Sequence, residues 1–165
     1  MKRWAGTLLL LSAAALAGPV KANCDPAVDY SVKGEYRRSE FVGLVTVRSV
    51  TWLDEDRKPA PLRGPLMLGS IPGGFDPYSG ALYDVSVNRA FKGRSAGRID
   101  IFSENTEART PLKVGARYLV FLYRQMRSND DDRAGDRMID YCGNSAFAAK
   151  AGRKIALLER LSRRR

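Results

Sequence analysis

Histidine is absent from this chain of 165 residues, and cysteine occurs only twice. Without histidine, a Ser-His-Asp or Cys-His nucleophile cannot be built, and the usual zinc sites with histidine ligands are excluded. No spacing of serine, threonine and lysine indicates a nucleophile of another type. The sequence therefore predicts no catalytic residues, no metal site and no cofactor, and we expect a protein that is not an enzyme.

Long apolar runs are also missing outside the N-terminal region. The basic pair Lys2-Arg3 precedes an apolar run at 8–17, and small residues follow, which is the layout of a secretory signal peptide. The run is too short to span a bilayer as a helix. We predict that residues 1–22 are a signal peptide, with cleavage before Asn23 favoured over cleavage before Gly18. The processed chain should be exported, periplasmic or secreted, and should not cross a membrane.

The two cysteines lie far apart, at Cys24 and Cys142. The region 23–165 is large enough for one domain and too small for two. In an oxidising compartment an even number of cysteines favours a disulfide, so we predict a Cys24–Cys142 bond. The alternative is a pair of free, buried thiols.

Basic residues are concentrated at the C-terminus. The whole chain has a net charge of +10, and residues 150–165 contribute +6 of it. This tail, with Arg160, Arg163, Arg164 and Arg165, could contact an anionic envelope surface or an acidic partner. The alternative is a solvated helix whose final arginines complement the helix dipole.

The predicted signal peptide contributes a further +3, so the rest of the domain has a net charge of only +1, which argues against nucleic-acid binding by the barrel. Tyr83, Phe91 and Tyr123 could stack on bases, but export and the low charge argue against this hypothesis, and we expect no nucleic-acid partner.

Five segments are rich in β-branched and aromatic residues, with partial or clear alternation. They are Phe41–Trp52, Leu82–Phe91, Arg98–Ser103, Arg117–Tyr123 and Arg137–Cys142. Gly43 indicates a bulge or a close bend in the first. Since closure removes exposed edges, we predict a mainly β fold, a small five-stranded closed Greek-key barrel of the OB type.

A helix is expected after the last strand. Apolar residues recur there at intervals of three and four: Phe147, Ala151, Ile155, Leu158 and Leu161. This pattern predicts a C-terminal amphipathic helix packed on the barrel, with Asn144 or Ser145 as its N-cap.

The segment 54–80 is unusually long for a loop and contains five prolines. Such loops are usually functional or disordered, so a contact surface and a mobile loop stay equally open. The acidic triplet at 130–132 lacks the spacing of a calcium loop, and we expect a solvated hairpin tip there.

Several short motifs occur in order along the chain. They are Cys24, Phe41-Val42-Gly43-Leu44-Val45, Ala90-Phe91-Lys92-Gly93, Val114-Gly115-Ala116-Arg117-Tyr118-Leu119-Val120-Phe121 and Cys142-Gly143-Asn144-Ser145. Together they resemble the tissue-inhibitor-of-metalloproteinases-like (TIMP-like, netrin-like) domains of exported bacterial proteins. The resemblance spans nearly the whole processed chain and implies an OB barrel.

For the inhibitory animal members, the resemblance implies that a first-residue cysteine chelates the catalytic zinc of a metalloprotease through its amino group and carbonyl. That role would fall on Cys24, flanked by the long loop. The expected target contacts are Asn23, Cys24, Asp25, Gly69, Ser70 and Tyr78. This chain departs from the inhibitors at Cys24-Asp25-Pro26, where they carry a second cysteine two places on.

The function expected from the sequence is an exported, non-catalytic binding module with a protein partner. Inhibition of a metalloprotease is its special case. The alternative is a periplasmic, envelope-associated or immunity-type protein that binds its partner through the 54–80 loop and the basic tail.

Overall fold

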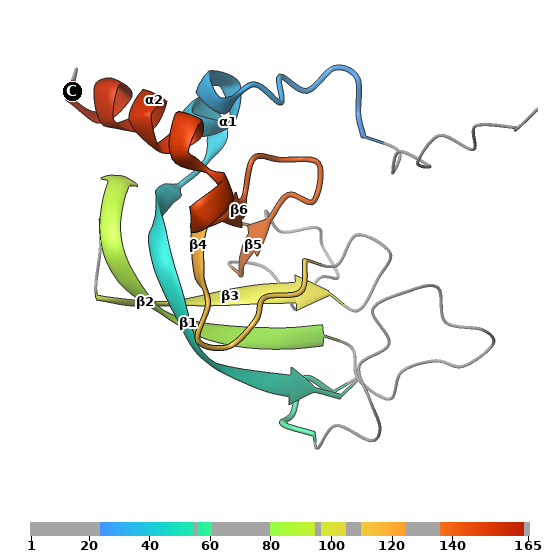
Figure 1. Ribbon diagram of the computed structural model, residues 1–165. Helices are drawn as coiled ribbons and strands as arrows, with labels where there is room; N and C mark the ends of the chain where they lie inside the picture. Colours follow the sequence, from blue (N-terminus) through green and yellow to red (C-terminus); the bar gives the residue numbers. More distant parts are fainter. Residues whose placement is uncertain are drawn as a thin grey trace, which may run out of the picture.

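Six ranges of the chain are described by the computed structural model (Figure 1): 24–54, 56–60, 80–94, 97–104, 110–124 and 136–163. The helices and strands are α1 (Val32–Arg38), β1 (Phe41–Leu53), β2 (Gly80–Lys92), β3 (Arg98–Glu104), β4 (Arg117–Arg124), β5 (Arg137–Ile139), β6 (Ala146–Phe147), the 3-10 turn η1 (Ala148–Lys150) and α2 (Gly152–Ser162). The predicted signal peptide and the acidic triplet lie outside the described residues. No helix in these ranges is long and apolar enough to cross a membrane.

Five strands close into a barrel. β1 pairs with β2, β2 with β3, β3 with β5, β5 with β4, and β4 with β1 again. Only the β3–β5 pairing is parallel, and β6 adds to β4 beyond the barrel. The predicted mainly β fold, a small closed barrel with a C-terminal helix, is confirmed.

β4 separates two apolar clusters, and this explains why it is apolar on both faces. Tyr118, Val120 and Leu122 point into a cluster that draws on all five barrel strands. Leu119 and Phe121 point into a second cluster with residues of α1 and α2. The first cluster fills the barrel, and the second packs both helices against it. In Figure 1 both helices lie at the top of the view, above the strands.

Gly43 lies where β1 bends, as the sequence predicts. The register between β1 and β2 shifts on both sides of Gly43–Leu44. A Cβ atom at Gly43 would come within 2.6 Å of the Arg89 carbonyl oxygen. Glycine is therefore required for the close approach of the two strands.

The C-terminal helix begins later than predicted, at Gly152. Ala146 and Phe147 instead pair with Leu119 and Tyr118 of β4, and the Phe147 ring stacks on Tyr118 at 4.5 Å. The helical spacing of Phe147 was therefore coincidental, because strand pairing fixes the backbone there.

The predicted N-caps are also wrong. Asn144 donates from its side chain to the Tyr30 carbonyl at 2.7 Å, and the Ser145 hydroxyl accepts from the Phe121 N–H at 2.9 Å. Both side chains serve tertiary contacts instead. The last barrel strand ends at Ile139 rather than at Cys142, because the chain turns there: the Gly143 N–H donates to the Asp140 carbonyl.

Helix α1 was not predicted from the sequence. The Ser31 hydroxyl caps it by accepting from the Gly34 N–H at 3.0 Å. Arginines 37 and 38 in its last turn complement the dipole. With seven residues it is too short to show helical periodicity, although Ser31 before it is a recognisable start signal.

The predicted disulfide joins Cys24 to Cys142, with the Cα atoms 5.9 Å apart and a sequence separation of 118. It fastens the segment before α1 to the turn after β5. No free cysteine remains in the described chain.

Removing this bond should cost about 4 to 5 kcal/mol of unfolding free energy in the chain-entropy model, because a very long loop is no longer closed in the unfolded chain. We expect the Cys24→Ser/Cys142→Ser variant to unfold at clearly lower urea than the oxidised protein. Unreduced and reduced wild type provide the matched comparison. Equal urea midpoints for all three would contradict this role of the bond.

Candidate functional site

A cleft of about 840 Å³ opens at the end of the barrel that carries the disulfide. Its walls come from α1, the ends of β3 and β4, β5, and the Asp140–Tyr141 turn. Val28, four residues after Cys24, also lines it. The segment that follows the disulfide therefore leads directly into a wall of the cleft.

The cleft combines an apolar floor with exposed tyrosines. Ile101, Phe102 and Ile139 are buried lining residues. Tyr123 and Tyr141 also line the cleft, and their exposed fractions are 37% and 42%. Among the described residues, only Val114 and Phe147 are comparably exposed large hydrophobic side chains. Two of the four exposed large hydrophobic side chains in the described chain thus line the same cleft.

One side of the rim is held by ion pairs. The Arg124 guanidinium binds both carboxylate oxygens of Glu40, at 3.0 and 3.1 Å. Arg137 approaches the same carboxylate at 3.5 Å. This bidentate arrangement fixes the start of β1 against the end of β4.

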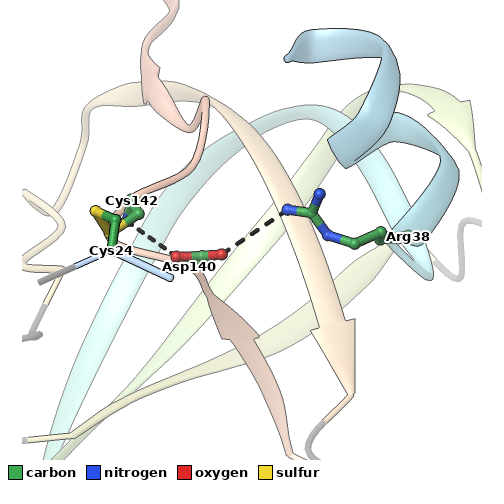
Figure 2. The surroundings of a disulfide bond; sticks show 4 residues. All are labelled: Cys24, Arg38, Asp140 and Cys142. Carbon is green, nitrogen blue, oxygen red and sulfur yellow. Dashed lines mark hydrogen bonds and ion pairs between the residues drawn. A yellow bond between two sulfur atoms is a disulfide. The ribbon is translucent and has the colours of Figure 1, made fainter. Parts of the chain in front are cut away.

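Asp140 connects the disulfide to the cleft (Figure 2). Its carboxylate accepts from the Cys142 N–H at 2.9 Å and faces the Arg38 guanidinium at 3.9 Å. Figure 2 shows the Asp140 side chain lying between the disulfide and Arg38 of α1. The turn that carries Tyr141 is therefore tied covalently on one side and electrostatically on the other.

A second tie is the buried carboxylate of Glu35, whose side chain is 3% exposed. One oxygen accepts from the Asn144 backbone N–H at 2.6 Å and from its side-chain amide at 2.8 Å. The other oxygen has no hydrogen-bond partner in the described part of the chain. It lies so close to Gly143 that a Cβ atom there would collide with it. Glu35 thus docks α1 on the turn after the disulfide.

Burial raises the pKa of the Glu35 carboxyl, and the hydrogen bonds from Asn144 oppose this shift only in part. The pKa of the Tyr123 hydroxyl is also raised, first by burial and then by the negative charges of Asp140 and Glu104. Both shifts follow from placing acidic groups around a partly desolvated cleft.

Of the predicted contact residues, Cys24 and Asp25 are described, and both are exposed. The Asp25 carboxylate accepts from the Ala27 N–H at 2.9 Å and so shapes the turn that follows the disulfide. Asn23, Gly69, Ser70 and Tyr78 lie outside the described residues. Cys24 and Asp25 lie at the disulfide end of the barrel, next to the cleft.

The described stem of the long loop reaches the same site. Arg57 forms an ion pair with Asp136 at 2.6 Å, and its guanidinium lies 4.6 Å from the centre of the Phe102 ring. Phe102 belongs to the floor of the cleft. The long loop, for which a contact surface was one of two open interpretations, therefore begins beside the cleft.

The sequence did not single out Glu35, Asp140 or Tyr141 as site residues. Asp140 and Tyr141 directly precede Cys142, and their position next to a predicted disulfide was the available signal. Glu35 gave none, because its partner Asn144 is 109 positions away.

Two further expectations concern metals and bases. Within the described ranges, no group of three or more acidic, cysteine or histidine side chains is arranged to hold a metal ion. Tyr83 and Phe91, considered for base stacking, are buried at 2% and 5% exposure. They belong to the two cores and are not on the barrel surface.

Neither a protein-family model nor a curated protein matches this chain. The interpretation of the cleft therefore depends on its geometry.

Glu35→Gln should change how stability depends on pH. Because the folded pKa of Glu35 lies above its ordinary value of 4.5, the folded state binds more protons in the window just above that value. The unfolding free energy of the wild type should therefore fall as pH rises through this window. The glutamine variant cannot ionise, so its unfolding free energy relative to that of the wild type should increase from pH 4 to pH 8. Urea titrations at each pH measure this.

Two variants control the measurement. Glu35→Ala leaves the Asn144 donors unpaired and should cost about 1 to 3 kcal/mol. Glu159→Gln removes a surface carboxylate, paired with Arg89, and should follow the wild-type pH curve. If the unfolding free energies of Glu35→Gln and wild type change with pH in parallel, the buried carboxylate does not contribute to the pH dependence of stability, which contradicts the prediction.

Proposed function

We propose that the protein is an exported, non-catalytic binding module that engages a protein partner with the disulfide end of its barrel. The observation that carries the proposal is the pair of exposed tyrosines, Tyr123 and Tyr141, over an apolar floor in a cleft next to the disulfide. Tyrosines that are exposed in the free protein and flank an apolar depression are typical anchors of protein interfaces.

Rigidity supports this proposal. The Tyr141 turn is held by the Cys24–Cys142 bond, by Asp140 and by the Glu35–Asn144 hydrogen bonds. A surface that is already ordered loses little conformational entropy on binding. Cys24, Asp25 and the stem of the long loop lie around the same cleft and would widen the contact area.

Metalloprotease inhibition is the special case of this proposal. The TIMP-like resemblance assigns zinc chelation to the amino group and carbonyl of Cys24, which is exposed in this protein. An amine and a carbonyl can together occupy the open coordination positions of a catalytic zinc. The mechanism requires a processed chain that begins at Cys24. Cleavage before Asn23 would block the amine and leave the general binding role.

The second candidate is association with an anionic envelope surface through α2. Arg153, Arg160 and Arg163 are exposed, whereas Leu158 faces the barrel and is fully buried. No described acidic residue forms an ion pair with these three arginines. Because the apolar face of α2 is already used in the core, this contact would be electrostatic and peripheral. Arg164 and Arg165, which extend the predicted basic tail, lie outside the described residues.

The main proposal predicts site-specific crosslinking. A photoreactive p-benzoylphenylalanine in place of Tyr141 should capture a defined partner in the producing cells, because it faces the bound protein. The same group in place of Phe147, which is similarly exposed at 44%, should not.

With the identified partner purified, Tyr123→Ala should weaken binding by about tenfold or more, and Val114→Ala should leave it unchanged. Equal capture from both positions would sink the proposal.

The second candidate predicts binding to vesicles of anionic phosphatidylglycerol but not of neutral phosphatidylcholine. The triple variant Arg153→Gln/Arg160→Gln/Arg163→Gln should lose about 3 kcal/mol of binding free energy to the anionic vesicles, since each cation contributes about 1 kcal/mol near such a surface. The matched control replaces the exposed Arg48, Lys113 and Arg117, none of which is on α2. If both triple variants sediment with the vesicles to the same extent, α2 is not the binding surface.

A further inference from the structure

We propose that the cleft binds a cationic side chain of the partner, an arginine or a lysine, beside Tyr123 and against the carboxylates of Asp140 and Glu104. The inference rests on the proposed function, because it names the chemistry of the partner at the same cleft. Three features support it: the excess of acidic groups, their arrangement around one aromatic ring, and the engagement of the local arginines.

Among the lining residues that the structure describes, acidic groups outnumber basic ones. These residues include four carboxylates, those of Glu35, Glu40, Glu104 and Asp140, and two guanidiniums, those of Arg38 and Arg124. The charges come from α1, β3, β4 and the turns next to β1 and β5, so the excess is a property of the assembled cleft.

Both arginines of this lining are already engaged, and the neighbouring Arg57 and Arg137 are paired with Asp136 and Glu40. Arg124 is bound by both oxygens of Glu40. Arg38 donates to the Asp29 carbonyl, lies over the Tyr30 ring at 5.5 Å, and is 3.9 Å from one oxygen of Asp140. A guanidinium shared among three groups neutralises Asp140 only partly. An anionic ligand would have to displace these contacts, whereas a cationic one would add to them.

Tyr123 lines the same cleft as the carboxylates of Asp140, Glu104 and Glu35. Burial raises the pKa of its hydroxyl most, and the negative charges of these carboxylates raise it further. A negative potential at a partly exposed aromatic ring favours a cation there, through both charge attraction and cation–π contact. Arginine suits this environment best, because its planar group can stack on a ring while donating to carboxylates.

The protein uses the same chemistry within its own fold. Cations lie over the rings of Tyr30, Tyr36, Phe91 and Phe102, at 4.6 to 5.6 Å from the ring centres. None of these four rings is Tyr123. A cationic side chain of the partner would form at Tyr123 the cation–π contact that the chain forms at these four rings with its own side chains.

Short peptides test the inference directly. The probes are acetyl-Gly-Gly-X-Gly-Gly-amide peptides in which X is arginine, lysine, norleucine or glutamate, added to the ¹⁵N-labelled, disulfide-bonded protein. The arginine and lysine peptides should shift the amide signals of Tyr123, Glu104 and Asp140, and added salt should weaken their binding. The norleucine and glutamate peptides should bind at least about threefold more weakly.

Variants separate charge from shape. Glu104→Gln and Tyr123→Leu should each weaken the arginine peptide by about threefold or more, since one removes a charge and the other removes the ring. Glu159→Gln, a charge change on α2 outside the cleft, should have no effect. Folding of each variant is checked by its amide spectrum.

The possible failures are distinguishable. If norleucine or glutamate binds as tightly as arginine, or if no peptide binds, the inference of a cationic group is overturned. Crosslinking from position 141 can still succeed in that case, and the proposed binding module then stands with a different anchor. If crosslinking also fails to distinguish position 141 from position 147, the proposed function falls as well.

Discussion

The disulfide between Cys24 and Cys142 is the constraint on which the functional end of the molecule depends. It joins an N-terminal segment without regular structure to a turn that follows the shortest barrel strand. Neither segment belongs to the barrel core, so neither would hold a fixed position by apolar packing alone. Once they are linked, Asp140 and Glu35 add hydrogen bonds and an ion pair that fix α1 against the same turn.

This arrangement separates the packed core of the molecule from its candidate binding end. The barrel interior and the helix-covered outer face are filled by two separate apolar clusters, and β4 contributes to both. The end with the disulfide is different, because there a buried carboxylate is left partly unsatisfied and tyrosines stand exposed over a cleft. The apolar packing around β4 thus supports an end of the molecule that is held by the disulfide and by polar contacts. Exposed apolar surface of this kind is common at interaction sites.

Local patterns predict the barrel better than they predict the site. Alternation and β-branched residues identify the strands, and the two apolar faces of β4 indicate its central place. Phe147 fits a helical spacing but belongs to a strand, because pairing with Tyr118 overrides the local pattern. Nothing in the sequence distinguishes Glu35 from a surface glutamate. It is buried in the fold, where Asn144, 109 positions later, hydrogen-bonds to its carboxylate. The cleft combines residues of α1, β3, β4 and β5 with residues of the connecting segments, and no local pattern shows that they meet.

The account depends most directly on an exported chain closed by its disulfide, and one measurement tests both features. This is the intact mass of the protein recovered from cells that make the full chain, determined before and after reduction. The account predicts a chain that lacks residues 1–22 and gains the mass of two hydrogen atoms on reduction. A chain that begins at Cys24 would agree equally with the disulfide and would favour zinc chelation. A full-length chain, or one whose cysteines react with an alkylating agent without reduction, would contradict the account.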